Sequence, residues 1–242
     1  MNTPAALIAS SQQLRDVVAV QPLVQRRLQQ LQRWQVTRLR HTYDDFSTQP
    51  RYHDALEFFV NDLYGPHDYS QRDTELSRVL RMLERLLSAQ AVHTLTLALQ
   101  LESLSMNLDL AMAAVLDDMD ITPAIYQQAY QRVGRVADRQ RQIVLIVAAG
   151  RTLDGLVRNP AIGAALWAAA LPARIAGVSV LHDFLKRGYH AFSRMQGAGT
   201  LLTAIEQRET IIMNRLFSAA SEPFNWQCAE PHHSSSAGKE LQ

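Results

Sequence analysis

Cysteine is almost absent from this chain. Cys228 is the single cysteine in 242 residues, which excludes an intramolecular disulfide and indicates a reducing compartment. The N-terminus has no basic segment followed by an apolar run, so no secretion signal is expected. The most apolar region, residues 161–181, is interrupted by Pro172 and Arg174, and neither half approaches the roughly 20 residues of a membrane-spanning helix. We therefore interpret residues 161–181 as part of the core, and we expect a cytoplasmic protein with no transmembrane segment.

The motifs of the common catalytic and metal sites are missing as well. The chain has no Gly-x-Ser-x-Gly, no Gly-x-x-x-x-Gly-Lys and no Gly-x-Gly-x-x-Gly, so hydrolase and nucleotide-binding mechanisms of those types have no support. It also lacks the pair of Glu-x-x-His motifs of di-iron bundles and the Asp-x-Asp-x-Asp-Gly loop of an EF-hand. The net charge is only +1, and no helix-turn-helix pattern occurs, so nucleic acid is not an expected partner. No metal site is predicted, and the sequence identifies no cofactor.

What the chain has in abundance is helical periodicity. Hydrophobic residues make up 47% of it, and no segment alternates apolar and polar residues as a half-buried strand would. Prolines, glycines and capping residues divide it into predicted helices over residues 4–20, 22–46, 52–64, 70–87, 91–116, 123–159, 160–170, 179–195 and 201–219. Because a straight helix over 123–159 would be longer than a compact domain accommodates, we expect a bend near Gly150.

These elements predict an all-α fold. Residues 91–116 are apolar on nearly every face, which is typical of a central, buried helix. We expect one domain over residues 1–221, a single bundle of about eight or nine helices around that segment. The polar residues 222–242 are expected to form a disordered tail. Ser70 with Asp73 three residues later indicates a capped helix start.

The densest aromatic stretch begins at Tyr52 and ends at Gly65-Pro66. Ala55, Phe59 and Leu63 are spaced four apart and form an apolar stripe broad enough for a helix that faces the core.

Within this stretch, Phe58-Phe59-Val60-Asn61-Asp62-Leu63-Tyr64-Gly65 resembles the signature of the bacterial "FFLEELY motif" proteins, an uncharacterised family with no assigned activity. Residues 68–73 and 205–209 also resemble that family, and the likeness extends over about residues 25–218. Val60 stands in place of Leu, and Asn61-Asp62 in place of Glu-Glu. The loss of the first carboxylate argues against a metal or acid–base role at Asn61.

One candidate site is a pocket between helices for a small ligand or cofactor. Phe58, Phe59, Tyr64, Trp167 and Phe184 would line it, with His53, His182 or His190 as the polar group. His53 and Glu57 lie four residues apart on one helical face and could hold a metal ion or a proton together. The alternative for that pair is a weak surface contact.

A second candidate is an anion or partner patch at Arg132, Arg135 and Arg139. Their spacing places them on one face of a continuous helix, where they would receive a phosphate or a carboxylate-rich partner. The alternative is a solvated face paired with Asp138.

Two further groups of charged residues have structural interpretations. Asp117, Asp118 and Asp120 lie at a helix C-terminus, where a cation or basic partner, or simply neighbouring arginines, would offset them. Arg208 and Glu209 are expected to brace the last helix against a neighbour.

Three hypotheses for function remain from the sequence. The leading one is a non-catalytic protein that acts through protein contacts, with a homodimer as one form. The alternative is a helical bundle that binds a small ligand or cofactor, with a haem-oxygenase-like enzyme as one version by fold analogy. The third is membrane-surface association through the Arg-rich amphipathic residues 22–40.

Overall fold

The computed structural model describes residues 3–63, 70–86, 88–117 and 120–227. Within these residues every regular element is a helix, so the predicted all-α class is confirmed. The elements are α1 (Pro4–Ala19), α2 (Pro22–Thr42), α3 (Asp44–Ser47), α4 (Pro50–Glu57), the π-helix η1 (Phe58–Leu63), α5 (Ser70–Leu86), α6 (Ala89–Val115), α7 (Pro123–Val133), α8 (Val136–Val157), α9 (Pro160–Ala168), α10 (Ala170–Ile175), α11 (Ser179–Met195) and α12 (Gly199–Phe217). The described chain thus has twelve α-helices rather than eight or nine. Two expected helices are each divided, into α2 and α3 and into α7 and α8, and α10 occupies a stretch that was expected to be a loose loop.

Helix starts follow the proline and capping signals in the sequence. Five helices, α1, α2, α4, α7 and α9, begin with a proline, whose missing N–H costs nothing at that position. The Thr122 hydroxyl accepts a hydrogen bond from the Ile125 N–H at 3.3 Å, and the Asn159 side chain accepts one from the Ala161 N–H at 3.0 Å. These side chains satisfy backbone donors that have no partner inside the helix.

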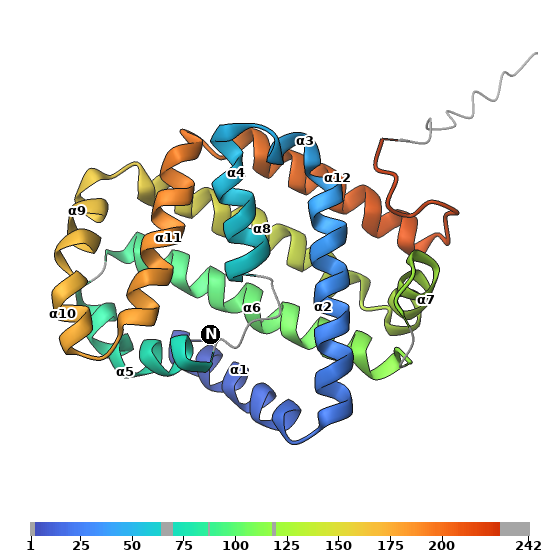
Figure 1. The fold of residues 1–242 in the computed structure, drawn as a ribbon, viewed down its shortest axis with the longest axis horizontal. Helices are drawn as coiled ribbons and strands as arrows, with labels where there is room; N and C mark the ends of the chain where they lie inside the picture. The colour runs from blue at the N-terminus through green and yellow to red at the C-terminus, as the bar shows by residue number, and fades with distance from the viewer. Residues whose placement is uncertain (1–2, 64–69, 87, 118–119, 228–242) are drawn as a thin grey trace, which may run out of the picture.

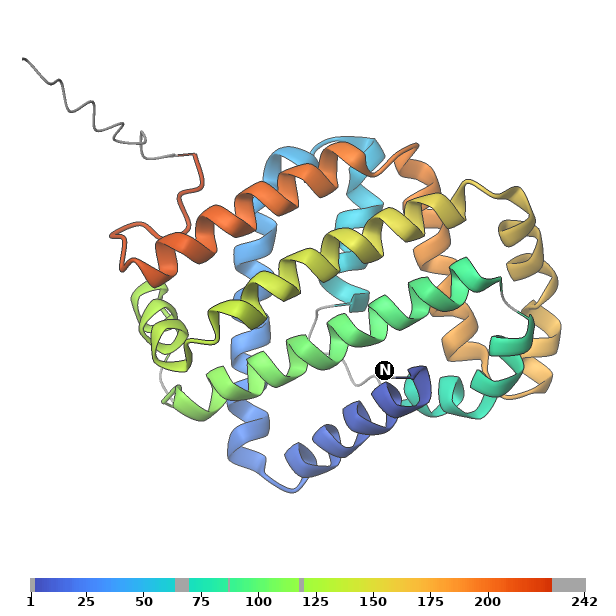
Figure 2. The ribbon, with the colours of Figure 1, turned by 180° about the vertical axis from the view of Figure 1, so that it is seen from behind.

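The helices form two crossing layers. In Figure 2, α1, α6, α8 and α12 lie side by side in one layer. In Figure 1, α2, α4 and α11 cross in front of that layer, with α7 at one end of the molecule and α9 and α10 at the other. Each layer therefore supplies an apolar face to the core between them.

α6 is the central helix, and it packs against α1, α2, α7 and α8. Leu108, Met112 and Ala113, in its C-terminal half, are completely buried. Leu95, Met106 and Leu110 are only partly buried. The completely buried residues of α6 thus lie in its C-terminal half, but partly buried residues occur along its whole length, so α6 is not buried on every face as expected.

Glycine lets α11 approach the aromatic stretch closely. Phe58, the first residue of η1, is buried, and a Cβ atom built at Gly188 would lie 2.8 Å from its Cζ atom. A larger residue at position 188 would therefore displace the Phe58 ring. Tyr64, Gly65 and Pro66, where the stretch was expected to end, lie outside the described residues.

The prediction of one helix from Pro123 to Asn159 is wrong. Gly134 and Arg135 have φ angles of 65° and 59°, a left-handed conformation that ends α7 before α8 begins. The bend expected near Gly150 is absent, since α8 continues through that residue. Gly150 serves a different purpose, because a Cβ atom there would overlap the side chain of Leu202 on α12.

The described chain continues in contact with the bundle beyond the expected boundary at residue 221. The Phe224 ring lies 5.3 Å from that of Trp34 on α2, and the Trp226 ring lies 3.7 Å from the Arg208 guanidinium carbon. Aromatic packing of this kind fixes residues 222–227 against α2 and α12. The rest of the expected tail, residues 228–242, lies outside the described residues.

Candidate functional site

The structure brings together only some of the residues that were predicted to line one aromatic pocket. The rings of Phe58 and Phe184 are 5.4 Å apart, and the rings of Phe59 and Phe192 are 5.5 Å apart. These phenylalanines pack on one another where η1 meets α11. Trp167 does not join them, because its residue is 81% exposed on α9. Tyr64 lies outside the part of the chain that the structure describes.

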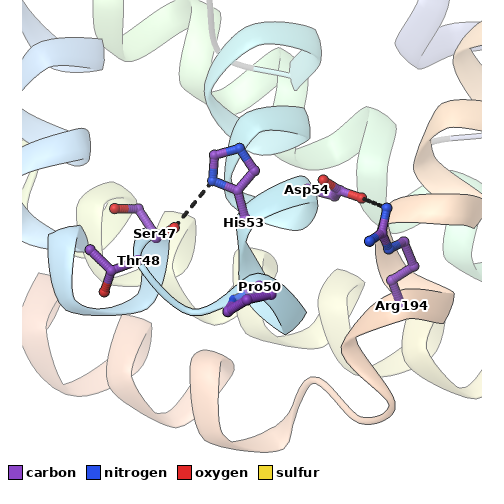
Figure 3. Close-up of a pocket in the computed structure, with 6 residues that line it drawn as sticks. All are labelled: Ser47, Thr48, Pro50, His53, Asp54 and Arg194. Atoms are coloured by element: carbon purple, nitrogen blue, oxygen red, sulfur yellow. Dashed lines mark hydrogen bonds and ion pairs between the residues drawn. The ribbon is translucent and has the colours of Figure 1, made fainter.

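His53 borders a surface pocket of about 330 Å³ instead (Figure 3). The lining residues are Ser47, Thr48, Pro50, His53, Asp54 and Arg194. The Nδ1 atom of His53 lies 3.1 Å from the Ser47 carbonyl oxygen, and Arg194 donates to Asp54 at 2.7 Å. His53, Asp54 and Arg194 thus already have protein partners.

Glu57 does not pair with His53 as the sequence suggested. Arg40 donates to both of its carboxylate oxygens, at 2.8 and 2.9 Å, and the Asn61 amide donates at 2.7 Å. Partial burial opposes ionisation of Glu57, but these hydrogen bonds outweigh it and hold its pKa below the ordinary value. Asn61 therefore supports an ion pair between α2 and α4.

The other candidate histidines have different surroundings. His182 is nearly buried, and its Nε2 atom lies 2.8 Å from the Leu166 carbonyl oxygen, which ties α11 to α9. His190 is exposed. Among the residues that the structure describes, no three His, Cys, Asp or Glu side chains converge as metal ligands would.

The three arginines of the predicted patch do not share a helical face, because the break at Gly134 separates them. Arg132 and Arg135 are exposed, and Arg135 donates to Asp138 at 2.7 Å. Arg139 alone turns inward: it is 4% exposed, and its guanidinium carbon lies 4.5 Å from the centre of the Tyr130 ring.

A buried cluster of charges that the sequence did not reveal joins α1, α5 and α6. Arg72 donates to Asp73 at 2.8 Å and to Glu102 at 2.9 Å, and Arg15 binds the same two carboxylates. Asp73 was expected to cap α5, yet it is 2% exposed and faces this cluster. Burial and the nearby Glu102 raise the pKa of Asp73, although both arginines oppose that shift.

A second network fastens α12 to α2 and α3, as expected for Arg208 and Glu209. Arg208 donates to both carboxylate oxygens of Asp45, each at 2.7 Å, and these hydrogen bonds hold the pKa of Asp45 below its ordinary value. Glu209 accepts hydrogen bonds from Arg38 at 2.6 Å and from the Tyr43 hydroxyl at 2.9 Å. Both residues therefore hold the last helix in place.

A recess of about 730 Å³ lies beside this network, between the C-terminal end of α2, α3 and residues 221–227. Its carboxylates already have protein partners: Asp45 binds Arg208, Asp44 accepts from Ser47, and Glu222 accepts from Asn225. The recess is thus large enough for a small ligand, but its carboxylates are already bound to other protein groups.

Alkaline pH is expected to destabilise the protein through Tyr43 and Tyr130. Burial raises the pKa of both phenols above the ordinary value of about 10. Above that pH the unfolded chain loses protons that the folded chain retains, so stability present at neutral pH is lost as pH rises. Well above pH 10 the free energy of unfolding should fall by roughly 1 kcal/mol per pH unit for each tyrosine. Urea unfolding between pH 10 and 12 measures this slope, and Tyr130→Phe should roughly halve it; an equal slope in the variant would contradict the assignment.

The most unusual surface of the molecule is the outward side of α9 and α10, which we name the α9–α10 face. Three large apolar residues spaced four apart stand on it, with exposures of 81% for Trp167, 64% for Leu171 and 79% for Ile175. None of the residues of α9 is fully buried. The other exposed residues of the face are Ala161, Ala164, Ala165, Ala168, Pro172, Arg174 and Ala176. Contiguous apolar surfaces of this kind mark interaction sites on soluble proteins.

The inward side of the same helices is firmly held. A Cβ atom at Gly163 would overlap the Tyr189 ring of α11, so α9 packs closely against that side chain. His182 contacts the Leu166 carbonyl oxygen, and Ala173 is buried. The outward exposure of Trp167 therefore does not reflect a loosely attached helix. No helix of the described chain combines the length and apolar character required to span a bilayer.

A family model described as a domain of unknown function (DUF8198) matches residues 14–223 of this chain. No curated protein matches the chain, and no solved structure matches it.

Proposed function

The chain belongs to the DUF8198 family, and we propose that it is a non-catalytic helical protein that acts through protein contacts and pairs with a second copy of itself at the α9–α10 face. The observation that carries this proposal is the exposure of Trp167, Leu171 and Ile175 on one surface whose single charged residue is Arg174. Large apolar side chains at the centre of a patch are the residues that contribute most to binding.

The size of the face fits a stable dimer. Trp167, Leu171 and Ile175 together leave on the order of 400 Å² exposed, given the area of large side chains. The neighbouring alanines and Pro172 extend this area toward the roughly 800 Å² that each partner contributes to an interface of standard size. Small residues such as alanine also allow two helices to approach closely.

The lack of charge favours a second copy over an unrelated partner. Residues 160–173 contain no charged side chain, so a charged surface placed against them would lose its hydration without gaining an ion pair. A two-fold interface places the same patch on both sides and so matches apolar surface with apolar surface. Arg174, the one charge on the face, can remain hydrated at the rim.

The test is sedimentation velocity over a series of protein concentrations. The wild-type chain is expected to sediment as a dimer, and the double substitution Trp167→Ser with Ile175→Ser is expected to weaken dimerisation by at least about 100-fold, as loss of two hot-spot residues does. Val20 and Val144 are 77% and 62% exposed elsewhere on the surface, so Val20→Ser with Val144→Ser is the matched control and should dimerise normally.

Two results would contradict the proposal: a wild-type chain that remains monomeric at every concentration, or a Trp167/Ile175 variant that dimerises as well as the control. Unchanged circular dichroism of each variant would show that the helices remain folded.

A further inference from the structure

Arg139 is an interior cation whose hydrogen-bonding capacity is largely unused. The residue is 4% exposed and lies one helical turn inside α8. Its Nη1 atom makes a single long hydrogen bond, 3.4 Å, to the Gln142 side chain. Its Nε and Nη2 atoms are buried and have no hydrogen-bond partner. A buried donor without an acceptor is costly, more so when it carries charge.

The unpartnered edge is chemically specific. The Nε–H bond and one Nη2–H bond lie in the plane of the guanidinium and are parallel. This geometry allows both groups to donate to two oxygens of one carboxylate or phosphate. A single acceptor, such as one carbonyl oxygen or one water molecule, would leave one of the two donors unsatisfied. The edge therefore matches an oxyanion better than a single acceptor.

The surroundings of Arg139 do not supply such an anion from the protein. Asp138, its neighbour in the chain, accepts from Arg135 on the surface. Glu209 is engaged by Arg38 and the Tyr43 hydroxyl, and Asp109 accepts from the Gln35 amide at 3.2 Å. The Nε atom of Arg38 is likewise buried without an acceptor. The Oε1 atom of Gln35 on α2 is also buried without a donor, so three unpartnered guanidinium nitrogens face one unpartnered side-chain acceptor in this interior.

We propose that the Nε–Nη2 edge of Arg139 binds a small oxyanion, a carboxylate or a phosphate, in the interior between α7 and α8. Tyr130 covers the guanidinium from α7, and the anion enters at the joint between the two helices, where residues 135–137 are exposed. Of the three arginines that the sequence singled out, only Arg139 keeps an anion-binding role. This proposal is independent of self-association.

Thermal unfolding in different sodium salts at constant ionic strength tests the site. Relative to chloride, acetate or phosphate at about ten times the dissociation constant should raise the midpoint of wild-type unfolding by about 3–6 °C. Arg139→Lys keeps the positive charge but removes the paired Nε and Nη2 donors, so it should abolish the salt-specific shift. Arg141 is exposed two residues away, and Arg141→Lys should retain the full shift. A larger shift with acetate than with phosphate identifies a carboxylate site, and the reverse identifies a phosphate site.

A second measurement does not depend on the folding of a variant. In the wild-type protein, the nitrogen-15 NMR signal of the Arg139 Nε–H group should move on titration with the preferred anion and saturate. The proposal is overturned if that signal does not move, if the wild-type midpoint is the same in all three salts, or if Arg139→Lys retains the shift.

Discussion

Replacement of Arg72 by methionine is expected to lower the free energy of unfolding by about 3–5 kcal/mol, the usual cost of removing one partner from a buried ion pair. The Arg72 side chain is 9% exposed and donates to Asp73 and Glu102. Without it, Asp73, whose side chain is 3% exposed, keeps only Arg15 as a cationic partner in this cluster. Methionine fills a similar volume against Phe184, so the loss reflects the charge rather than a cavity.

The matched control is Arg151→Met. Arg151 pairs with Glu206 at 3.5 Å, and the two side chains are 65% and 51% exposed. Pairs of this kind contribute at most about 1 kcal/mol. Urea unfolding of both variants at one fixed protein concentration measures the difference. A loss at Arg72 of no more than about 1 kcal/mol would show that the cluster between α1, α5 and α6 contributes no more than an exposed pair.

The second large effect is expected at Leu108, in the C-terminal half of α6. Leu108→Ala removes a completely buried side chain and should cost about 2–5 kcal/mol through lost burial and the cavity left behind. Leu23 on α2 is 46% exposed, and Leu23→Ala, the same chemical change, should cost less than about 0.5 kcal/mol. A small effect at Leu108, measured by urea unfolding, would contradict the central position of α6.

Local signals in the sequence predicted the class and most helix starts. Pro22, Pro123 and Pro160 begin helices as expected, since proline position and capping depend only on neighbouring residues. The break at Gly134 was missed because one glycine inside a periodic apolar run is compatible with a continuous helix. Gly150 was expected to bend α8 because the sequence does not show that Leu202 needs the space.

The sites were harder to predict because they join distant parts of the chain. Arg38 and Glu209 are 171 positions apart, and Arg72 and Glu102 are 30 apart. Periodicity identifies which residues share a helical face, but it does not show whether another helix covers that face. Trp167 was therefore expected in a pocket, and Arg139 on a solvated or partner-binding surface. In the structure Trp167 is exposed and Arg139 is buried.

The α9–α10 face was not predicted for the same reason: periodicity does not show whether another helix covers a helical face. Residues 161–181 have the composition of a core segment, and the expectation that they are buried within one chain is natural. Trp167, Leu171 and Ile175 are exposed in the folded chain, so only a second molecule can bury them.

Amide hydrogen exchange at low and high protein concentration tests the central claim, self-association at the α9–α10 face, most directly. If two copies pair there, amides of residues 160–176 should exchange more slowly at high concentration, while those of α1 and α2 exchange at the same rate throughout. Concentration-independent exchange over 160–176, or protection that develops only on another surface, would contradict the account.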